Sequence, residues 1–76
     1  MADLLEWIVR RLVDEPDAVR VETEEREDAI VFHLHVAQDD VGKVIGRQGR
    51  MARALRSIVR AAGARADERY LLEIAD

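Results

Sequence analysis

The sequence of 76 residues contains no cysteine, one proline and three aromatic residues. Without cysteine, disulfides, thiolate metal sites and cysteine nucleophiles are excluded. No apolar run approaches the roughly 20 residues of a membrane-spanning helix, and the basic and apolar pattern of a secretory signal is missing from the N-terminus. We therefore expect one globular domain, residues 1–76, located in the cytoplasm.

Charge is distributed unevenly along the chain, whose formal net charge is −4. Residues 1–40 carry twelve acidic and four basic side chains, whereas residues 41–60 carry six basic side chains and no acidic one. A concentrated basic patch attracts anions even on an acidic protein, because the local potential steers the ligand. The segment 41–60 is therefore the expected binding region.

This segment combines a glycine turn with the start of a helix. Gly46 and Gly49 bracket Arg47 and Gln48, and glycine permits positive φ angles and the close approach of another chain. From Arg50 onward, apolar residues recur at helical spacing. They are Met51, Ala54, Leu55, Ile58, Val59 and Ala62. The first N–H groups of such a helix have no intrahelical partner and lie at the positive end of its dipole, so the turn predicts a phosphate site.

Arginines surround the predicted site. Helix N-termini normally favour acidic residues, yet Arg47 and Arg50 flank this one and Arg53 follows one turn later. Two interpretations fit the pattern: the arginines of the helix form a solvated face, or an anionic ligand supplies the missing negative charge. We favour the ligand, because the glycine turn and the basic side chains converge on one place.

The N-terminal residues predict a first helix with a wide apolar surface. Asp3 is expected to cap this helix, with Glu6 completing a capping box. The helix should end by Glu15, because Pro16 disfavours the α conformation of the residue before it. Trp7 lies beside the apolar stripe. We expect Trp7 in the core, since large apolar residues are usually buried; a subunit contact is the alternative.

Three segments alternate between apolar and polar residues, as half-buried strands do. They are Ala18–Glu24, Ala29–Val36 and Tyr70–Ile74. The first two are joined by a short charged turn and should form an antiparallel hairpin. His33 and His35 share one face of the second strand, where we expect a polar outer surface rather than a metal site, because two ligands are too few.

Two further helices are expected between the second and third strands. Asp39 or Asp40 can cap a short helix before the glycine turn. The long helix should run from Arg50 to about Ala62, with Gly63 as its stop. The predicted order is α-β-β-α-α-β, an α+β fold with the helices packed on one face of a three-stranded sheet.

The run Val44–Met51, VIGRQGRM, resembles the VIGxxGxx(I/M) core of KH domains, which bind single-stranded nucleic acid. The order of elements resembles the type II KH arrangement. The chain length and the opening pattern, including Leu12–Asp17, resemble the small bacterial KhpA proteins, so the resemblance covers essentially the whole chain. It implies a binding groove between the short helix with its GxxG loop and the neighbouring strand edge.

Several apolar residues are candidates for the floor of this groove. They are Val41, Val44 and Ile45, with Val36 or Leu34 from the second strand. Ordinary core packing is the alternative for each of them. No aromatic residue lies in the basic segment 41–60, so recognition by aromatic stacking is not expected.

Two functions from different classes fit these observations. The first is a binding module for single-stranded RNA, which would serve as an RNA chaperone or post-transcriptional regulator; RNA is preferred over DNA only by the resemblance. The residues predicted to contact RNA are Lys43, Ile45, Gly46, Arg47, Gln48, Gly49, Arg50 and Arg53. The second is a protein-interaction module that forms a homodimer or pairs with a Jag/KhpB-type KH protein, with RNA contact secondary.

Enzymatic chemistry has little support in the sequence. The glycines fit neither GxxxxGK(S/T) nor GxGxxG, which excludes the common nucleotide-binding motifs. Ser57 lies among arginines with no evident base nearby, so it is no candidate nucleophile. We therefore expect no catalytic activity, no cofactor, no metal, no small-molecule substrate and no membrane partner.

Overall fold

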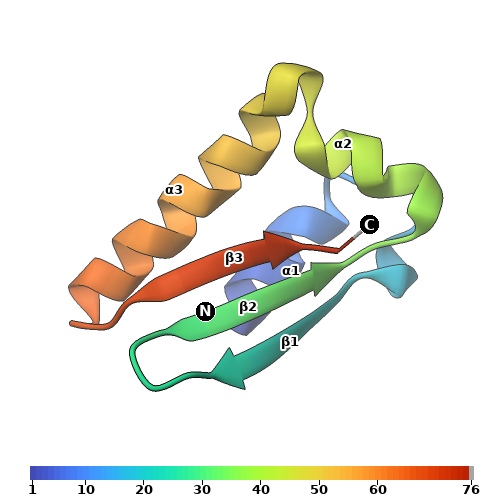
Figure 1. Cartoon of the computed structure of the whole chain (residues 1–76). Coiled ribbons are helices and arrows are strands. Elements are labelled where there is room, and N and C mark those ends of the chain that lie inside the picture. The colour runs from blue at the N-terminus through green and yellow to red at the C-terminus, as the bar shows by residue number, and fades with distance from the viewer. Residues whose placement is uncertain (76) are drawn as a thin grey trace.

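The computed structural model describes residues 1–75, which form three α-helices and a three-stranded mixed sheet (Figure 1). The elements are α1 (Ala2–Arg10), β1 (Arg20–Glu25), β2 (Ile30–His35), α2 (Val41–Ile45), α3 (Arg50–Arg65) and β3 (Tyr70–Ile74). Short 3-10 turns precede β1, α2 and α3. This order confirms the predicted α-β-β-α-α-β arrangement and the α+β class.

The central strand of the sheet is β2, which pairs antiparallel with β1 and parallel with β3. The parallel pair needs a crossover connection, and α2 and α3 supply it. Helix α1 packs against β1 and α3 packs against β3, so both cover the same face of the sheet (Figure 1). No helix among residues 1–75 is long and apolar enough to cross a membrane.

The core lies between the helices and this face of the sheet. Its buried members are Leu5, Val9, Val19, Phe32, Leu34, Val44, Leu55, Val59 and Leu72. Phe32 also packs edge to face against Tyr70, with ring centroids 5.1 Å apart. The alternation predicted for β2 is confirmed, since Phe32 and Leu34 enter the core while His33 and His35 stay on the opposite face. Each strand begins or ends within two residues of its prediction.

Helix α1 differs from its prediction at both ends. It begins at Ala2 after Met1, so Asp3 lies in the first turn and caps nothing; there its carboxylate still favours the positive end of the helix dipole. The helix ends at Arg10, short of the predicted Glu15. The reason is tertiary, because the N–H groups of Asp14 and Glu15 donate to the Asp40 side chain instead of to helix carbonyls.

The expectation that Trp7 lies in the core was wrong. Its side chain is 55% exposed, and the Arg11 guanidinium lies 3.7 Å from the ring centroid. Leu5 and Val9 already fill the side of α1 that faces the sheet. An amphipathic helix has one buried side, so a residue two positions from Leu5 and Val9 points outward.

Gly63 does not end α3, which continues to Arg65. A Cβ at Gly63 would lie 2.8 Å from the Glu68 carbonyl oxygen and 2.9 Å from the backbone nitrogen of Tyr70. Glycine is therefore required there because β3 returns directly against the helix. The requirement comes from a tertiary contact, which the sequence pattern of a helix stop cannot distinguish.

Candidate nucleic-acid interface

The turn between α2 and α3 has backbone angles that favour glycine. Gly46 has φ 78° and ψ 172°, and Gly49 has φ 75° and ψ 13°. A Cβ at Gly46 would also lie 2.7 Å from Met51 Cβ, so conformation and space both require glycine there. At Gly49 the nearest atom to such a Cβ is 3.6 Å away. The first glycine therefore allows close packing of the two helices, and the second sets the direction of the chain.

Gln48 adopts a left-handed conformation as well, with φ 56° and ψ 25°. This conformation is unfavourable for a residue with a Cβ, by about 1 kcal/mol or more. Two arginines support it: Arg53 Nη1 donates to the Gln48 carbonyl oxygen at 3.1 Å, and Arg50 Nη2 donates to Gln48 Oε1 at 3.4 Å. The turn is therefore held in one shape by the basic residues of α3.

The N-terminus of α3 has no side-chain cap within residues 1–75. Gly49 occupies the N-cap position and has no side chain to accept from the first N–H groups, and the first turn contains no acidic residue. Unpaired N–H groups and the helix dipole together attract an anion to this end. The arrangement is the one that the sequence predicts for a phosphate site.

Seven arginines from the turn to the start of β3 have no carboxylate within 4.0 Å among the described residues. They are Arg47, Arg50, Arg53, Arg56, Arg60, Arg65 and Arg69. Arginines elsewhere in the chain, such as Arg10 and Arg26, do pair with carboxylates, so the lack of pairing is confined to part of the molecule. It leaves a basic surface that can bind an external polyanion.

Two clefts lie between α3 and β3. The first has a volume of about 370 Å³, and its lining is Arg60, Ala64, Glu68, Arg69, Tyr70 and Leu71. The second has a volume of about 320 Å³, and its lining is Arg56, Arg60, Leu71, Leu72 and Glu73. At 100° per residue, Arg53, Arg56 and Arg60 share one side of α3. Since Arg53 contacts the glycine turn, this row connects the turn with the clefts.

The outer edge of β3 presents unpaired backbone groups to these clefts. The Arg69 carbonyl accepts from Ile30 N, and Ala75 N donates to the Leu34 carbonyl, so the odd-numbered residues of this segment face β2. In a parallel pair the alternate residues face away from the neighbouring strand. The N–H and C=O groups of Tyr70, Leu72 and Ile74 therefore point outward, where they can form hydrogen bonds with a ligand.

Residues 2–74 match the family model described as KhpA/KhpB, KH domain. The chain belongs to this KH-domain family. Among curated relatives, an RNA-binding protein KhpA from Borreliella burgdorferi is 46% identical over 97% of this chain and 90% of its own length. KhpA proteins from Clostridium acetobutylicum and Listeria monocytogenes are 46% and 42% identical, over 97% of this chain and at least 97% of their own lengths. No solved structure matches the chain.

The family supports the prediction that the chain has no catalytic activity. The curated relatives are RNA-binding proteins by name, and the matching model describes a KH domain, which is a binding fold and no enzyme. This agrees with the absence of catalytic motifs from the sequence. Among residues 1–75, no group of three or more His, Asp or Glu side chains is arranged to hold a metal ion.

The KH domain places most of the predicted contact residues together at one end of the molecule. The glycine turn with Arg47, Gln48, Arg50 and Arg53 lies between α2 and α3, and Ile45 is half-buried beside it. Lys43 differs from the others, because its Nζ lies 3.0 Å from Asp14 Oδ2 and 3.7 Å from Asp40 Oδ1. The hydrogen bond with Asp14 raises the pKa of Lys43, so its charge is already paired within the domain.

The candidate groove floor is divided between core and surface. Val44 and Leu34 are fully buried, whereas Val36, Val41 and Ile45 are half-buried. The two clefts beside the arginines open along β3, whereas the strand residues proposed for the groove floor from the sequence, Val36 or Leu34, lie on or next to β2. The backbone edge of β3 and the lining residues Arg56 and Arg60 were missed, because only the fold shows that β3 is an edge strand next to α3.

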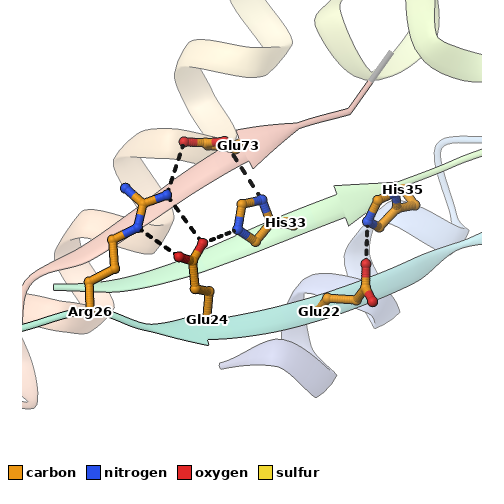
Figure 2. Close-up of polar contacts among 6 residues, drawn as sticks. All are labelled: Glu22, Glu24, Arg26, His33, His35 and Glu73. Carbon is orange, nitrogen blue, oxygen red and sulfur yellow. Dashed lines mark hydrogen bonds and ion pairs between the residues drawn. The ribbon is translucent and has the colours of Figure 1, made fainter.

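On the face of the sheet away from the helices, charged side chains pair with one another. Figure 2 shows six side chains joined by arginine–carboxylate ion pairs and by histidine–carboxylate contacts across all three strands and the hairpin. They are Glu22, Glu24, Arg26, His33, His35 and Glu73. Glu24 lies 3.1 Å from Arg26 and 2.8 Å from His33. The hydrogen bonds with Arg26 and then His33 lower the pKa of Glu24 from 4.5 to about 2. This face satisfies its own charges and offers no basic surface.

Proposed function

We propose that this chain is a bacterial single-stranded RNA-binding protein that holds the sugar-phosphate backbone at the turn Gly46–Gly49. The observation that carries the proposal is the run of arginines from Arg47 onward. They lie beside an uncapped helix N-terminus and have no carboxylate within 4.0 Å in residues 1–75. Phosphates supply the negative charge that this surface lacks. The names of the curated relatives, which are RNA-binding proteins, support RNA as the ligand.

The RNA runs from the turn along the side of α3 that carries Arg53, Arg56 and Arg60. Phosphates near the turn meet the first N–H groups of α3, together with Arg47 and Arg50. The bases lie toward the clefts beside β3, where outward-facing N–H and C=O groups can form hydrogen bonds with base edges. Ile45 contributes apolar surface at the start of this path.

Few side chains are available to distinguish one base from another. The clefts are lined mainly by arginines and by the apolar surfaces of β3. Base stacking on aromatic rings has little part, because Trp7 lies on α1 and Phe32 is buried in the core. Tyr70 lines the first cleft, but its ring already packs edge to face against Phe32. Binding of low sequence specificity suits an RNA chaperone or a post-transcriptional regulator in the cytoplasm.

The test is fluorescence anisotropy with a short unstructured RNA. The double variant Arg47→Asp, Gln48→Asp should lose most of its binding, because it places two carboxylates where phosphates lie. The matched control is Arg20→Asp, Gln38→Asp, which makes the same chemical change at two exposed positions outside the turn and α3. Circular dichroism checks that both variants fold. Equal RNA affinity of the folded loop variant and the wild type would refute the proposal.

A second candidate function is self-pairing, or pairing with a Jag/KhpB-type KH protein. Its support is the exposure of three large apolar side chains: Leu4 at 50%, Trp7 at 55% and Ile58 at 40%. Glu6 accepts a hydrogen bond from Val21 at the free edge of β1. Leu4 lies about 200° around α1 from Glu6, so it faces the side of α1 nearer to α3.

The same reasoning places Ile58 on the matching side of α3. Arg56 and Arg60 line the clefts at β3, and Ile58 lies about 200° from each of them around the helix. The exposed apolar residues of the two helices therefore border the same valley over the sheet, on the side of α3 away from the arginine row. A domain with a small core gains stability by covering such a surface.

Sedimentation velocity over a range of concentrations tests this second function. A dimer at micromolar concentration should become a monomer in Ile58→Asp, while RNA binding per chain stays within about twofold, because the valley and the arginine row lie on different sides of α3. The control Gln38→Asp adds the same charge elsewhere and should remain dimeric. A wild-type monomer at high micromolar concentration would contradict self-pairing.

A further inference from the structure

Asp40 is the one buried charged residue among the described residues, with a side chain 1% exposed. Its Oδ1 accepts from the backbone N–H of Asp14 at 3.2 Å, and its Oδ2 accepts from the backbone N–H of Glu15 at 3.0 Å. Burial alone favours the neutral carboxyl, but these two donors and Lys43 outweigh it and lower the pKa of Asp40. A buried carboxylate with both oxygens engaged is a fixed structural anchor.

Lys43 completes this cluster from the other side. It lies on α2, and its Nζ reaches Asp14 Oδ2 at 3.0 Å and Asp40 Oδ1 at 3.7 Å. The cluster therefore joins the segment after α1 to the beginning of α2 at three points: the N–H groups of Asp14 and Glu15, and the carboxylate of Asp14. We call Asp14, Glu15, Asp40 and Lys43 the clamp.

The clamp acts on a short helix that buries few side chains. Helix α2 has five residues, and Val44 is its only fully buried side chain. A helix of little more than one turn is unstable in isolation, so its position depends on tertiary contacts. Gly46, the first residue of the glycine turn, follows α2 directly, and its N–H donates to the Gly42 carbonyl at 2.8 Å. Any movement of α2 therefore moves the turn.

We propose that the clamp positions the glycine turn for RNA, so that Asp40 and Lys43 are positioning residues and Lys43 does not bind phosphate itself. The inference rests on the proposed RNA-binding function and revises one of the contact residues that the sequence suggests. The geometry supports it, because the Lys43 ammonium has two carboxylate partners, while the arginines of the turn and α3 have none within the part of the chain that the structure describes. A binding site needs such support from its surroundings to keep its geometry.

The test combines RNA affinity with its salt dependence for Lys43→Gln, Asp40→Asn and the double variant. Each direct phosphate contact on single-stranded nucleic acid contributes about 0.7 to the slope of log K against log salt. If Lys43 only positions the turn, Lys43→Gln weakens binding by about threefold and leaves the slope unchanged. Asp40→Asn weakens binding by roughly tenfold, again with the same slope, because the loss of one member of a polar network disturbs the members that remain.

The double variant tests whether the two residues act together. Substitutions within one interacting cluster do not have additive effects, so the double variant should bind RNA no more weakly than Asp40→Asn alone. Arg47→Gln is the control for a direct contact, and its slope should become shallower by about 0.7. Urea unfolding checks each variant. If Asp40→Asn does not fold, the affinity and salt slope of Lys43→Gln, a change at an exposed position, test the inference alone.

Two results would overturn the inference while leaving the proposed function intact. The first is a slope that becomes shallower by about 0.7 in Lys43→Gln, which makes Lys43 a phosphate contact. The second is wild-type affinity in both Lys43→Gln and Asp40→Asn, combined with weakened binding in Arg47→Gln. Wild-type affinity in Arg47→Gln and in the loop double variant would instead refute the turn as the RNA site.

Discussion

The two charged regions of this domain differ in whether their charged side chains are paired. On the open face of the sheet, Glu24, Arg26, His33 and Glu73 pair with one another across three strands and the hairpin turn (Figure 2). From the glycine turn through α3, arginines stand without any carboxylate within 4.0 Å among the described residues. The proposed binding site therefore rests on unpaired charge rather than on charge itself.

Backbone geometry separates the two regions as well. The hairpin turn between β1 and β2 has no positive φ angle, whereas the glycine turn has three, at Gly46, Gln48 and Gly49. Conformations of this kind are retained where the surrounding structure stabilises them, and they cluster at functional sites. The open face of the sheet is thus a self-contained scaffold surface, and the glycine turn is the part that we propose to bind RNA.

The largest expected effect comes from Gly46→Ala, which disrupts the glycine turn. The added Cβ would lie 2.7 Å from Met51 Cβ, at a φ of 78°. The unfavourable φ contributes about 1–2 kcal/mol and the overpacking about 1–3 kcal/mol. We expect the free energy of unfolding, measured by urea denaturation, to fall by roughly 2–5 kcal/mol, and RNA binding to be lost.

Gly42→Ala is the matched control for this change. Gly42 lies in α2, and nothing lies within 4 Å of a Cβ added there. Alanine is the better helix former, so this variant should be up to about 1 kcal/mol more stable than the wild type. Equal stabilities of the Gly46 and Gly42 variants would contradict the close packing of the turn against Met51.

A smaller effect is expected from the arginines of α3. Arg56→Gln and Arg60→Gln should each weaken RNA binding by roughly threefold to fourfold near 0.15 M salt and make the salt slope shallower by about 0.7, the contribution of one phosphate contact. Arg26→Gln, on the sheet, should leave affinity and slope unchanged, because Arg26 already pairs with Glu24. Anisotropy titrations at four salt concentrations measure both quantities. Equal losses in all three variants would show that net charge, not the arginine row, governs binding.

The smallest effect concerns the pH dependence of the sheet. The pKa of Glu24 is lowered from 4.5 to about 2 by Arg26 and His33. A lowered pKa means that the ionised form stabilises the fold above about pH 4.5, and this stabilisation is lost as the pH falls toward 2. Urea midpoints from pH 6 to pH 2.5 should therefore fall more steeply for the wild type than for Glu24→Gln. Glu24 is exposed to solvent, so the difference will be small, and parallel pH curves would show that these pairs do not stabilise the fold.

The sequence predicts the elements of this fold well where the information is local. Alternation defines all three strands, and the glycines and apolar stripe define the start of α3 at Arg50. It fails where a residue serves a distant contact. Gly63 has the features of a helix stop, yet it lies inside α3, where a Cβ would come within 2.9 Å of Tyr70. Asp40 has the features of a helix cap, yet its side chain accepts hydrogen bonds from the segment after α1.

The candidate site follows the same division. The turn and its arginines are contiguous in the chain, so spacing and charge are enough to predict them. The edge of β3 lies more than twenty residues further along, and nothing in its own sequence shows that its outer side is unpaired. Likewise, Lys43 and Arg47 carry the same positive charge in the sequence. Only the structure shows that Lys43 is paired, whereas Arg47 has no carboxylate within 4.0 Å among residues 1–75.

The measurement that tests the central claim most directly is the affinity of the wild-type protein for a short unstructured RNA over a range of salt concentrations. Three or four phosphate contacts predict a slope of log K against log salt near −2 to −3. Such a slope, reduced in the loop double variant, would establish that the unpaired arginines at the glycine turn bind the RNA backbone. A slope near zero would contradict the account.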